Sequence, residues 1–340
     1  MISRSRAALT FSIVFLFAVT AQAGERKIRT VTYSGAEVVQ PSVLYSGSRL
    51  KSGIAFSDSL LDFELLRIDS LYFSQGRLAV SVSIDTLTGP ESVDISMEIE
   101  EGEQTRIAAV KISGPSAIPL DQAARILGLN EGDLFRPVDI ETALGSLLRA
   151  YNTSGYPYAQ VWLTQFDYDA ALNRVNLAVS VFEGERSVLS SVMFDGLSKT
   201  DSSFALRVSR LRTGVRYDEE AVMLGRTYLQ AAGVFRSVGE PAVLQLEKGK
   251  VAIRYPVEEA DRSNLFQGAL GVAQRGGDDY VLSGAVDLDL KHIGGMGRDA
   301  HLSWMDNGES HSRLSLSYHE PFIFGSPLSL DAEVGQVIQD

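Results

Sequence analysis

Apolar positions in the middle of the chain follow the period of a helix. Between residues 140 and 151 they recur every three or four positions, which places them on one face of an α-helix. These positions are Ile140, Leu144, Leu147, Leu148 and Tyr151. Asp139 precedes this face, where its carboxylate can accept a free helix N–H, and Gly155 follows it, where glycine takes a left-handed backbone without strain. The pattern predicts a helix that begins near Asp139 and ends before Gly155.

After this helix the apolar positions alternate with polar ones. Ala159, Val161 and Leu163 share one face, and a turn follows near residues 169–173. The alternation then resumes at Val175, Leu177, Val179 and Val181. A period of two on both sides of a turn is typical of a β-hairpin with one buried face.

The same arrangement occurs three times, with a period of roughly 80 residues. Each copy opens with a strand that ends in glycine, contains a G-x-x-aromatic motif and has a helix that exits through glycine. The strand ends are Gly35, Gly114 and Gly196; the motifs join Gly53 to Phe56, Gly132 to Phe135 and Gly214 to Tyr217; the helix exits are Gly76, Gly155 and Gly233. We therefore predict an α+β protein with tandem β-α-α-β-β repeats at residues 26–103, 105–185 and 187–261.

From residue 264 to residue 340 the helical period is replaced by strict alternation. Five strands are predicted, at residues 266–273, 280–290, 298–305, 311–319 and 328–334. In the second of them Val286 and Leu288 share one face, while Asp287 and Asp289 share the other. Strands of about 9 to 11 residues with one apolar and one polar face suit a transmembrane β-barrel. A soluble sandwich of two sheets is the alternative.

The N-terminus has the pattern of a secretory signal peptide. Arg4 and Arg6 precede an apolar run at residues 7–19, and small residues follow at Ala21 and Ala23. The pattern predicts a signal peptide at residues 1–23, cleaved between Ala23 and Gly24. A membrane anchor is the alternative, but the run is short for about 30 Å of hydrocarbon.

The composition argues against nucleic-acid binding and against sites that need cysteine. The 340 residues carry a net charge of −12, which argues against a nucleic-acid partner, since such proteins present a basic face. There is no cysteine, so disulfides and thiolate zinc sites are excluded. Hydrophobic residues make up 45% and charged residues 22%, as in globular proteins.

Candidate chemistry is sparse. His301, His311 and His319 have no short ligand spacing and no evident carboxylate partner, so we expect no metal site. The glycines at residues 294–297 do not match G-x-G-x-x-G and predict a turn. We interpret the acidic runs at residues 98–103 and 258–261 as solvated strand ends. The prediction is a protein that is not an enzyme and has no cofactor.

The repeats resemble POTRA (polypeptide-transport-associated) domains, and the tail resembles the first strands of the Bam/Tam-type outer-membrane assembly barrel that follows them. Residues 266–271 resemble the first barrel strand, and residues 288–298 resemble the first periplasmic turn, N-L-F-G-x-G, with His292 in place of the Asn. Residues 318–322, Tyr-His-Glu-Pro-Phe, resemble the family's Y-x-E-P-[YF] strand end. Because the family barrels have many more strands, the resemblance implies a truncated barrel, in the N-terminal part of a longer protein.

The resemblance also implies a function and a location. It implies an outer-membrane protein assembly or translocation factor in the cell outer membrane, with periplasmic POTRA domains that bind clients by β-augmentation. The implied partners are unfolded outer-membrane or secreted polypeptides, accessory periplasmic or lipoprotein partners, and outer-membrane lipid. The first barrel strand would pair with clients through Phe266, Gly268, Leu270 and Val272. A periplasmic scaffold with a vestigial barrel and a two-partner secretion pore are the alternatives.

Overall fold

The computed structural model describes residues 26–274, 280–308, 311–326 and 328–339. The predicted signal peptide with Ala23 and Gly24, and residues 275–279 between the first two predicted strands of the tail, lie outside the described residues. The chain divides into two compact units. One unit holds the first two repeats except residues 151–159, and the other holds those residues, the third repeat and the strands that follow it.

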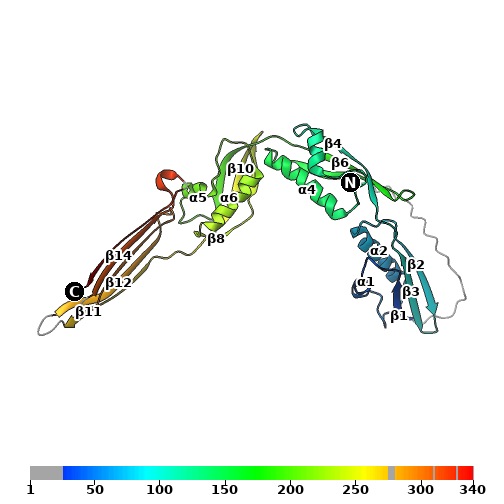
Figure 1. Ribbon diagram of the computed structural model, residues 1–340, viewed down its shortest axis with the longest axis horizontal. Coiled ribbons are helices and arrows are strands. Elements are labelled where there is room, and N and C mark those ends of the chain that lie inside the picture. The colour runs from blue at the N-terminus through cyan, green and yellow to red at the C-terminus, as the bar shows by residue number, and fades with distance from the viewer. Residues whose placement is uncertain (1–25, 275–279, 309–310, 327, 340) are drawn as a thin grey trace. The chain divides into compact units, whose positions relative to one another are not determined.

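The first repeat has the predicted β-α-α-β-β order. Its elements are β1 (Lys27–Ser34), α1 (Pro41–Gly47), α2 (Asp58–Ser74), β2 (Ser81–Thr88) and β3 (Ser92–Glu100). The sheet order is β1-β3-β2, with β1 parallel and β2 antiparallel to β3. The two helices lie against one face of this sheet (Figure 1), and Leu44, Ile68 and Met97 are fully buried between the layers.

The second repeat has the same topology. Its elements are β4 (Arg106–Ser113), α3 (Leu120–Leu127), α4 (Pro137–Thr153), β5 (Gln160–Asp169) and β6 (Arg174–Phe182), in the sheet order β4-β6-β5. The predicted helical face is confirmed, because Ile140, Leu147 and Tyr151 are buried. The predicted helix start is wrong by two residues: α4 begins at Pro137, which suits a first helical position, and Asp139 lies in the first turn.

The third repeat contains one additional strand. Its elements are β7 (Val188–Asp195), α5 (Ser202–Ser209), α6 (Glu219–Ala231), β8 (Phe235–Val238), β9 (Ala242–Glu247) and β10 (Lys250–Glu259). β10 lies parallel to β7 and antiparallel to both β8 and β9. Residues 239–241, which include Pro241, separate β8 from β9, so this edge of the sheet is interrupted.

The G-x-x-aromatic motif is a short antiparallel bridge to the first strand of each repeat. The glycine N–H donates to a carbonyl of that strand, at 2.7 Å from Gly53 to Ile28 and 2.8 Å from Gly132 to Ile107. The aromatic residue's N–H donates to the residue that precedes the strand, as from Phe135 to Thr105 at 2.8 Å. Gly214 and Tyr217 repeat both bonds, to Leu189 and Ser187. The motif therefore covers the start of one edge of each sheet.

Glu98, Glu100 and Glu258 are exposed, as interpreted from the sequence, but one glutamate at each strand end is bonded to the backbone. Each of Glu101, Glu183 and Glu259 accepts backbone N–H groups from the loop that follows the first strand of its own repeat. The strand-end glycine of that loop lies against the last strand of the repeat, which leads into the glutamate: a Cβ at Gly114 would lie 2.2 Å from the Val181 carbonyl oxygen. Gly35 and Gly196 have the same contact, to Ile99 and Val257. Glycine and glutamate together fix this loop in each repeat.

The tail forms one antiparallel sheet of five consecutive strands, which argues against two packed sheets. They are β11 (Leu265–Gln274), β12 (Tyr280–Ile293), β13 (Arg298–Asp306), β14 (His311–Glu320) and β15 (Leu330–Gln339). A short 3-10 helix, η1 (Ile323–Gly325), connects the last two strands.

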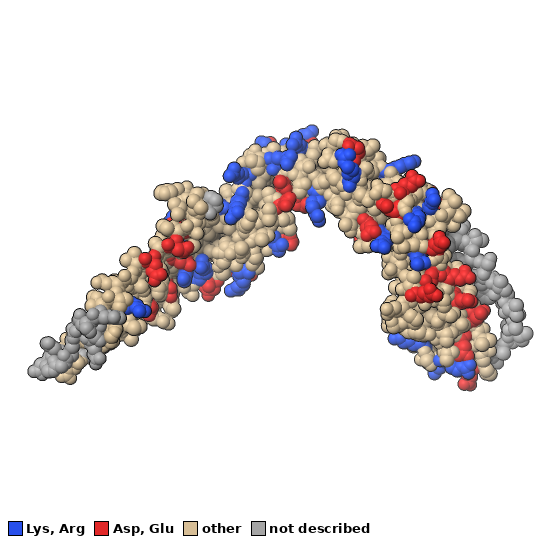
Figure 2. Space-filling model, in the orientation of Figure 1, with Lys and Arg blue, Asp and Glu red and all other residues tan. Residues whose placement is uncertain are grey.

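The two faces of this sheet differ as the alternation predicts. Directly paired residues form an apolar row on one face and a polar row on the other. The apolar row is Leu288, Leu302, Leu316 and Val334; the polar row is Asp289, His301, Ser317 and Glu333. Figure 2 shows charged side chains gathered at the end of the sheet next to the third repeat, with mostly uncharged residues over the rest of its visible surface.

The strand-end glycine gives a first prediction. Gly114 and Gly132 have similar left-handed backbones, with φ of 92° and 88°, but an added Cβ has no neighbour within 4 Å at Gly132. Gly132→Ala should lower the free energy of unfolding by about 1–2 kcal/mol, the cost of the left-handed backbone. Gly114→Ala should cost more, because its methyl also clashes with Val181. Denaturant unfolding followed by Trp162 fluorescence measures both, and equal losses would contradict the close-approach argument.

Candidate functional site

The turn between β12 and β13 contacts the third repeat directly. The Asp201 N–H, at the start of α5, donates to the Gly295 carbonyl at 3.0 Å. The ring Nε2 of His292 lies 3.0 Å from the Thr200 hydroxyl. The first turn of the sheet is therefore bonded to the loop that leads into α5.

His292, aligned with the Asn of the family motif, has a backbone conformation that also suits Asn. Its φ is 55°, a left-handed backbone in which Asn, Asp and His are enriched. Its Nδ1 accepts the Gly297 N–H at 3.0 Å, which closes the turn. Because Nδ1 accepts, Nε2 carries the proton and donates to Thr200. The departure from the family motif at this position is thus accommodated.

Two glycines of the turn are needed for close approach. A Cβ at Gly295 would lie 2.3 Å from the Lys199 carbonyl oxygen, and a Cβ at Gly297 would lie 2.5 Å from the Phe204 ring. Real Cβ atoms do not come this close to other heavy atoms. The glycines predicted only as a turn therefore also determine how tightly the sheet packs on the repeat.

Phe204 brings two sequence motifs together. Its buried ring packs edge-on against His292, from the turn, and against Phe322, from the Tyr-His-Glu-Pro-Phe strand end, each at 5.8 Å between centroids. The Arg207 guanidinium lies 5.8 Å from the Phe322 ring. Sequence reasoning missed Phe204, because a single aromatic residue on a short helix does not reveal what it contacts.

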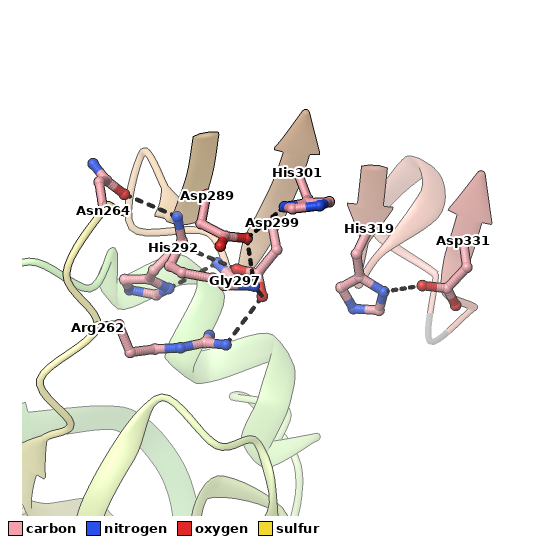
Figure 3. Close-up of polar contacts among 10 residues, drawn as sticks. Arg262, Asn264, Asp289, His292, Gly297, Asp299, His301, His319 and Asp331 are labelled. Atoms are coloured by element: carbon pink, nitrogen blue, oxygen red, sulfur yellow. Dashed lines mark hydrogen bonds and ion pairs between the residues drawn. The ribbon is translucent and has the colours of Figure 1, made fainter. Parts of the chain in front are cut away.

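Asp299 contacts both cationic side chains near the turn, Arg262 and Lys291 (Figure 3). Its carboxylate accepts the His292 backbone N–H at 2.9 Å and the Arg262 guanidinium at 3.0 Å, and the Lys291 ammonium lies 3.7 Å away. Arg262 belongs to the linker that leaves the third repeat, and Asn264 of this linker accepts the Lys291 N–H. A single carboxylate therefore connects the linker, the turn and the sheet.

His301 and His319 have carboxylate partners, contrary to the sequence interpretation. His301 Nδ1 lies 2.9 Å from Asp289, and His319 Nδ1 lies 2.6 Å from Asp331. Each pair is directly opposite across two strands, so the partners are neighbours in space but distant in sequence. His311 lies at the start of β14, away from both pairs. In the part of the chain that the structure describes, no group of three metal-ligand side chains occurs.

The residues predicted to pair with clients lie on β11. Phe266, Leu270 and Val272 are about two-thirds exposed, at 69%, 67% and 69%, and they share the apolar face with Gly268. The whole strand pairs with β12, from Leu265 opposite Asp289 to Gln274 opposite Tyr280. Among the described residues no helix is both long enough and apolar enough to cross a bilayer.

Comparison with known proteins identifies the repeats. The POTRA family model, described as a surface antigen variable number repeat, matches residues 26–102 and 105–184. The first two repeats therefore match POTRA repeats. The resemblance inferred from the sequence motifs is confirmed.

Two proteins similar to this chain are named as assembly factors. The chain is 25% identical to a proposed outer membrane protein assembly factor of Treponema pallidum and 20% identical to outer membrane protein assembly factor BamA of Neisseria meningitidis. The alignments cover 83% and 82% of this chain, but only 34% and 35% of the two relatives. The chain thus spans about a third of the length of these relatives.

A solved structure has a similar fold. BamA from Haemophilus ducreyi lacking POTRA domains 1-3 superposes with a TM-score of 0.51 at 21% identity, over 69% of this chain and 42% of that chain. The similarity to outer membrane protein assembly factors, together with the POTRA match, supports a location in the cell outer membrane, with the POTRA repeats in the periplasm.

The Phe204 contact gives a second prediction. Gly297→Ala should loosen the turn, because the new methyl meets the Phe204 ring, and Phe204→Ala should remove part of that clash. The double variant should therefore lose less stability than the sum of the two single variants, with a coupling of about 1 kcal/mol. Hydrogen exchange of the turn amides measures the effect. Additive losses would show that the two residues act independently.

Glu259 gives a third prediction, on pH. Burial acts to raise the pKa of Glu259, but hydrogen bonds from Ser198 and Thr200 outweigh it and lower the pKa to about 2. A carboxyl whose folded pKa is depressed contributes stability above its ordinary pKa of about 4.3, and this stability is lost as the pH falls toward the folded value. Glu259→Gln should therefore have a lower melting temperature than the native protein above about pH 5, and this deficit should shrink toward about pH 2.

The control is Glu258→Gln, which removes the neighbouring carboxylate that pairs with Arg236 on the surface. Melting temperatures of the three proteins across this pH range give the comparison. A Glu259→Gln deficit that stayed constant with pH would contradict the role of the ionised carboxylate.

Proposed function

We propose that this protein is an outer-membrane protein assembly or translocation factor whose POTRA repeats bind unfolded client polypeptides by β-augmentation. In that mode an extended peptide adds to an exposed sheet edge, and main-chain hydrogen bonds provide the affinity. Such binding requires no catalytic group and no cofactor. The assembly-factor relatives support the general role, and the sheet edges of the first two repeats support the mode of binding.

The G-x-x-aromatic motif favours one edge over the other. In the first repeat, the outer edge of β1 already bonds to residues 53–56, and the Tyr33 N–H donates to the Tyr45 hydroxyl. β2, at the opposite edge, has only β3 as a strand partner in the described part of the chain. The β2 edge is therefore the candidate for pairing with a client.

The corresponding edges differ between the repeats. β2 pairs with β3 in unbroken register over all eight residues. β5 has ten residues, with a shift of register at Thr164, and the third repeat has the interrupted pair β8 and β9. A continuous edge presents more aligned N–H and C=O groups than an interrupted one. We propose that clients bind chiefly to β2 and β5.

β11 is the second proposed pairing element. In the described part of the chain its strand partner is β12 alone. Gly268 and Gly271 reduce the side-chain packing along this strand, which weakens a strand and suits an edge that exchanges partners. Phe266, Leu270 and Val272 would then contact apolar client side chains on the same face.

A crosslinking experiment tests this function. Because the native chain has no cysteine, one introduced cysteine is the only thiol. Asp85→Cys on β2 and Gly268→Cys on β11 should form disulfides with a single cysteine in an unfolded outer-membrane polypeptide. Asp121→Cys, equally polar and 68% exposed on helix α3, is the matched control.

The expected yield is several-fold higher at the two strand positions than at Asp121. Crosslinks to folded periplasmic proteins alone would instead support the scaffold alternative. Equal yields at all three positions would contradict pairing at the strand edges.

A further inference from the structure

A groove of about 470 Å³ lies between the two helices of the second repeat. The end of α3 forms one side of it, and the first turns of α4 form the other. Leu127, Leu129 and Leu134 supply apolar surface. Thr142 and Ser146 line it from α4, and each hydroxyl donates to the helix carbonyl four residues earlier, at 2.8 and 2.9 Å. With its hydroxyl protons already bonded, the groove suits a side chain that packs against it.

The first and third repeats place a stacked pair of side chains at this position. The residue four places before the glycine of the G-x-x-aromatic motif is Arg49, Gly128 or Arg210. The Arg49 guanidinium lies over the ring of Phe63 on α2, at 4.0 Å from the ring centroid. The Arg210 guanidinium lies over the ring of Tyr228 on α6, at 4.2 Å. In both repeats an arginine that follows the first helix thus covers an aromatic ring on the second.

The second repeat lacks the arginine and the ring. Phe63 stands ten residues after its motif glycine, and Tyr228 stands fourteen residues after its own. The residues at the same spacings in the second repeat are Thr142 and Ser146, and Gly128 replaces the arginine. All three line the groove. The groove is therefore open where the other two repeats place a guanidinium on a ring.

The surrounding fold is the same in the three repeats. Leu44, Ala123 and Ala205 each stand nine residues before the motif glycine, and all three are fully buried. Gly128 and Arg210 both have a left-handed backbone, with φ of 67° and 57°. An arginine and a ring supplied from outside the chain can therefore lie in the second repeat as Arg210 and its ring lie in the third.

The charged residues of the groove suit an incoming guanidinium. They are two carboxylates, Asp133 and Asp139, and one cation, Arg136. The Asp133 carboxylate already accepts the Asn130 N–H at 2.8 Å. Asp139 lies in the first turn of α4 and forms no ion pair with any residue that the structure describes. Its carboxylate can accept a charge-assisted hydrogen bond from an arginine of another molecule.

We propose that a periplasmic partner protein docks on the second repeat by placing an arginine stacked on an aromatic ring in this groove. The pair would replace the one that the first and third repeats supply themselves. An exposed contact between a cation and a ring changes an affinity about two- to fivefold, so the groove determines which partner fits and adds to a wider interface. This docking goes beyond the proposed pairing of client strands, which takes place at sheet edges.

Disulfide tethering on the detergent-solubilised full chain tests the groove. Because the native chain has no cysteine, Ser146→Cys supplies one thiol on its wall. The probe is the peptide Cys-Gly-Tyr-Ala-Arg, whose ring and guanidinium lie on one side when it is extended. Matched peptides replace its tyrosine by alanine or its arginine by glutamine. Ser70→Cys is the control position, since Ser70 also donates to the helix carbonyl four residues earlier but lies outside the groove.

Intact-mass measurement in a mildly reducing buffer gives the tethered fraction. At Ser146→Cys the probe should tether at least about threefold more than either matched peptide, the size of one cation–π contact. At Ser70→Cys the three peptides should tether equally. Equal tethering of the three peptides at Ser146→Cys would overturn the proposed occupant.

A filled groove is the second test. Gly128→Arg with Thr142→Phe, added to Ser146→Cys, copies the pair of Arg49 and Phe63 and should abolish the preference for the probe. An added Cβ at Gly128 meets no atom closer than 3.9 Å, so the groove has room for the change. The melting temperature reports whether the variant folds, and a preference retained by the folded variant would overturn the site. The comparison of peptides at Ser146→Cys decides the proposal even if the filled variant does not fold.

Native mass spectrometry distinguishes the partner from a second copy of the chain. Dimers of the native protein that Gly128→Arg with Thr142→Phe loses would assign the groove to a second copy and overturn the separate partner. The crosslinking yields at β2 and β11 report independently on strand pairing. Loss of the peptide preference with those crosslinks retained would defeat this inference alone.

Discussion

Close approach between backbone segments is the constraint on which this structure depends. In every repeat a loop passes so near to a strand carbonyl that only glycine fits, as at Gly114 beside Val181. The same requirement returns at the junction, where Gly295 lies against Lys199. Because main-chain atoms meet directly, backbone hydrogen bonds fix the geometry, and the side chains around them are free to vary. This explains how three copies share one topology with little sequence identity beyond the glycines.

In each repeat a glutamate forms hydrogen bonds with the loop that approaches the strand. Glu101, Glu183 and Glu259 each bind the backbone of the loop that their glycine allows to approach. The carboxylate accepts hydrogen bonds from loop N–H groups that would otherwise need backbone carbonyls of a strand as acceptors. The repeats therefore use their terminal acids for structure. These three carboxylates bind backbone N–H groups of the chain itself. Fewer carboxylates are therefore available to partners than the net charge alone indicates.

Most of the fold could be predicted from the sequence, because local periods determine it. The helical face through Leu147 and the alternating faces of β12 each follow from neighbours in the chain. The junction could not be predicted in the same way. Phe204, Asp299 and the pairs His301–Asp289 and His319–Asp331 depend on residues that meet only after the sheet and the third repeat have formed. Family motifs located the turn and the Pro-Phe strand end, but the structure was needed to bring both to one ring.

The unbroken register of β2 has a consequence for the chain in isolation. An uncovered strand of eight residues is a template for any extended segment, including the same strand of a second copy. Asp85, near the middle of β2, opposes one register of such self-pairing, because two antiparallel copies centred on Asp85 bring two carboxylates directly opposite each other. The third repeat has the opposite solution, an edge divided beside Pro241. The edge most open to self-association is therefore that of the first repeat, at the end of the chain most distant in sequence from the five-stranded sheet.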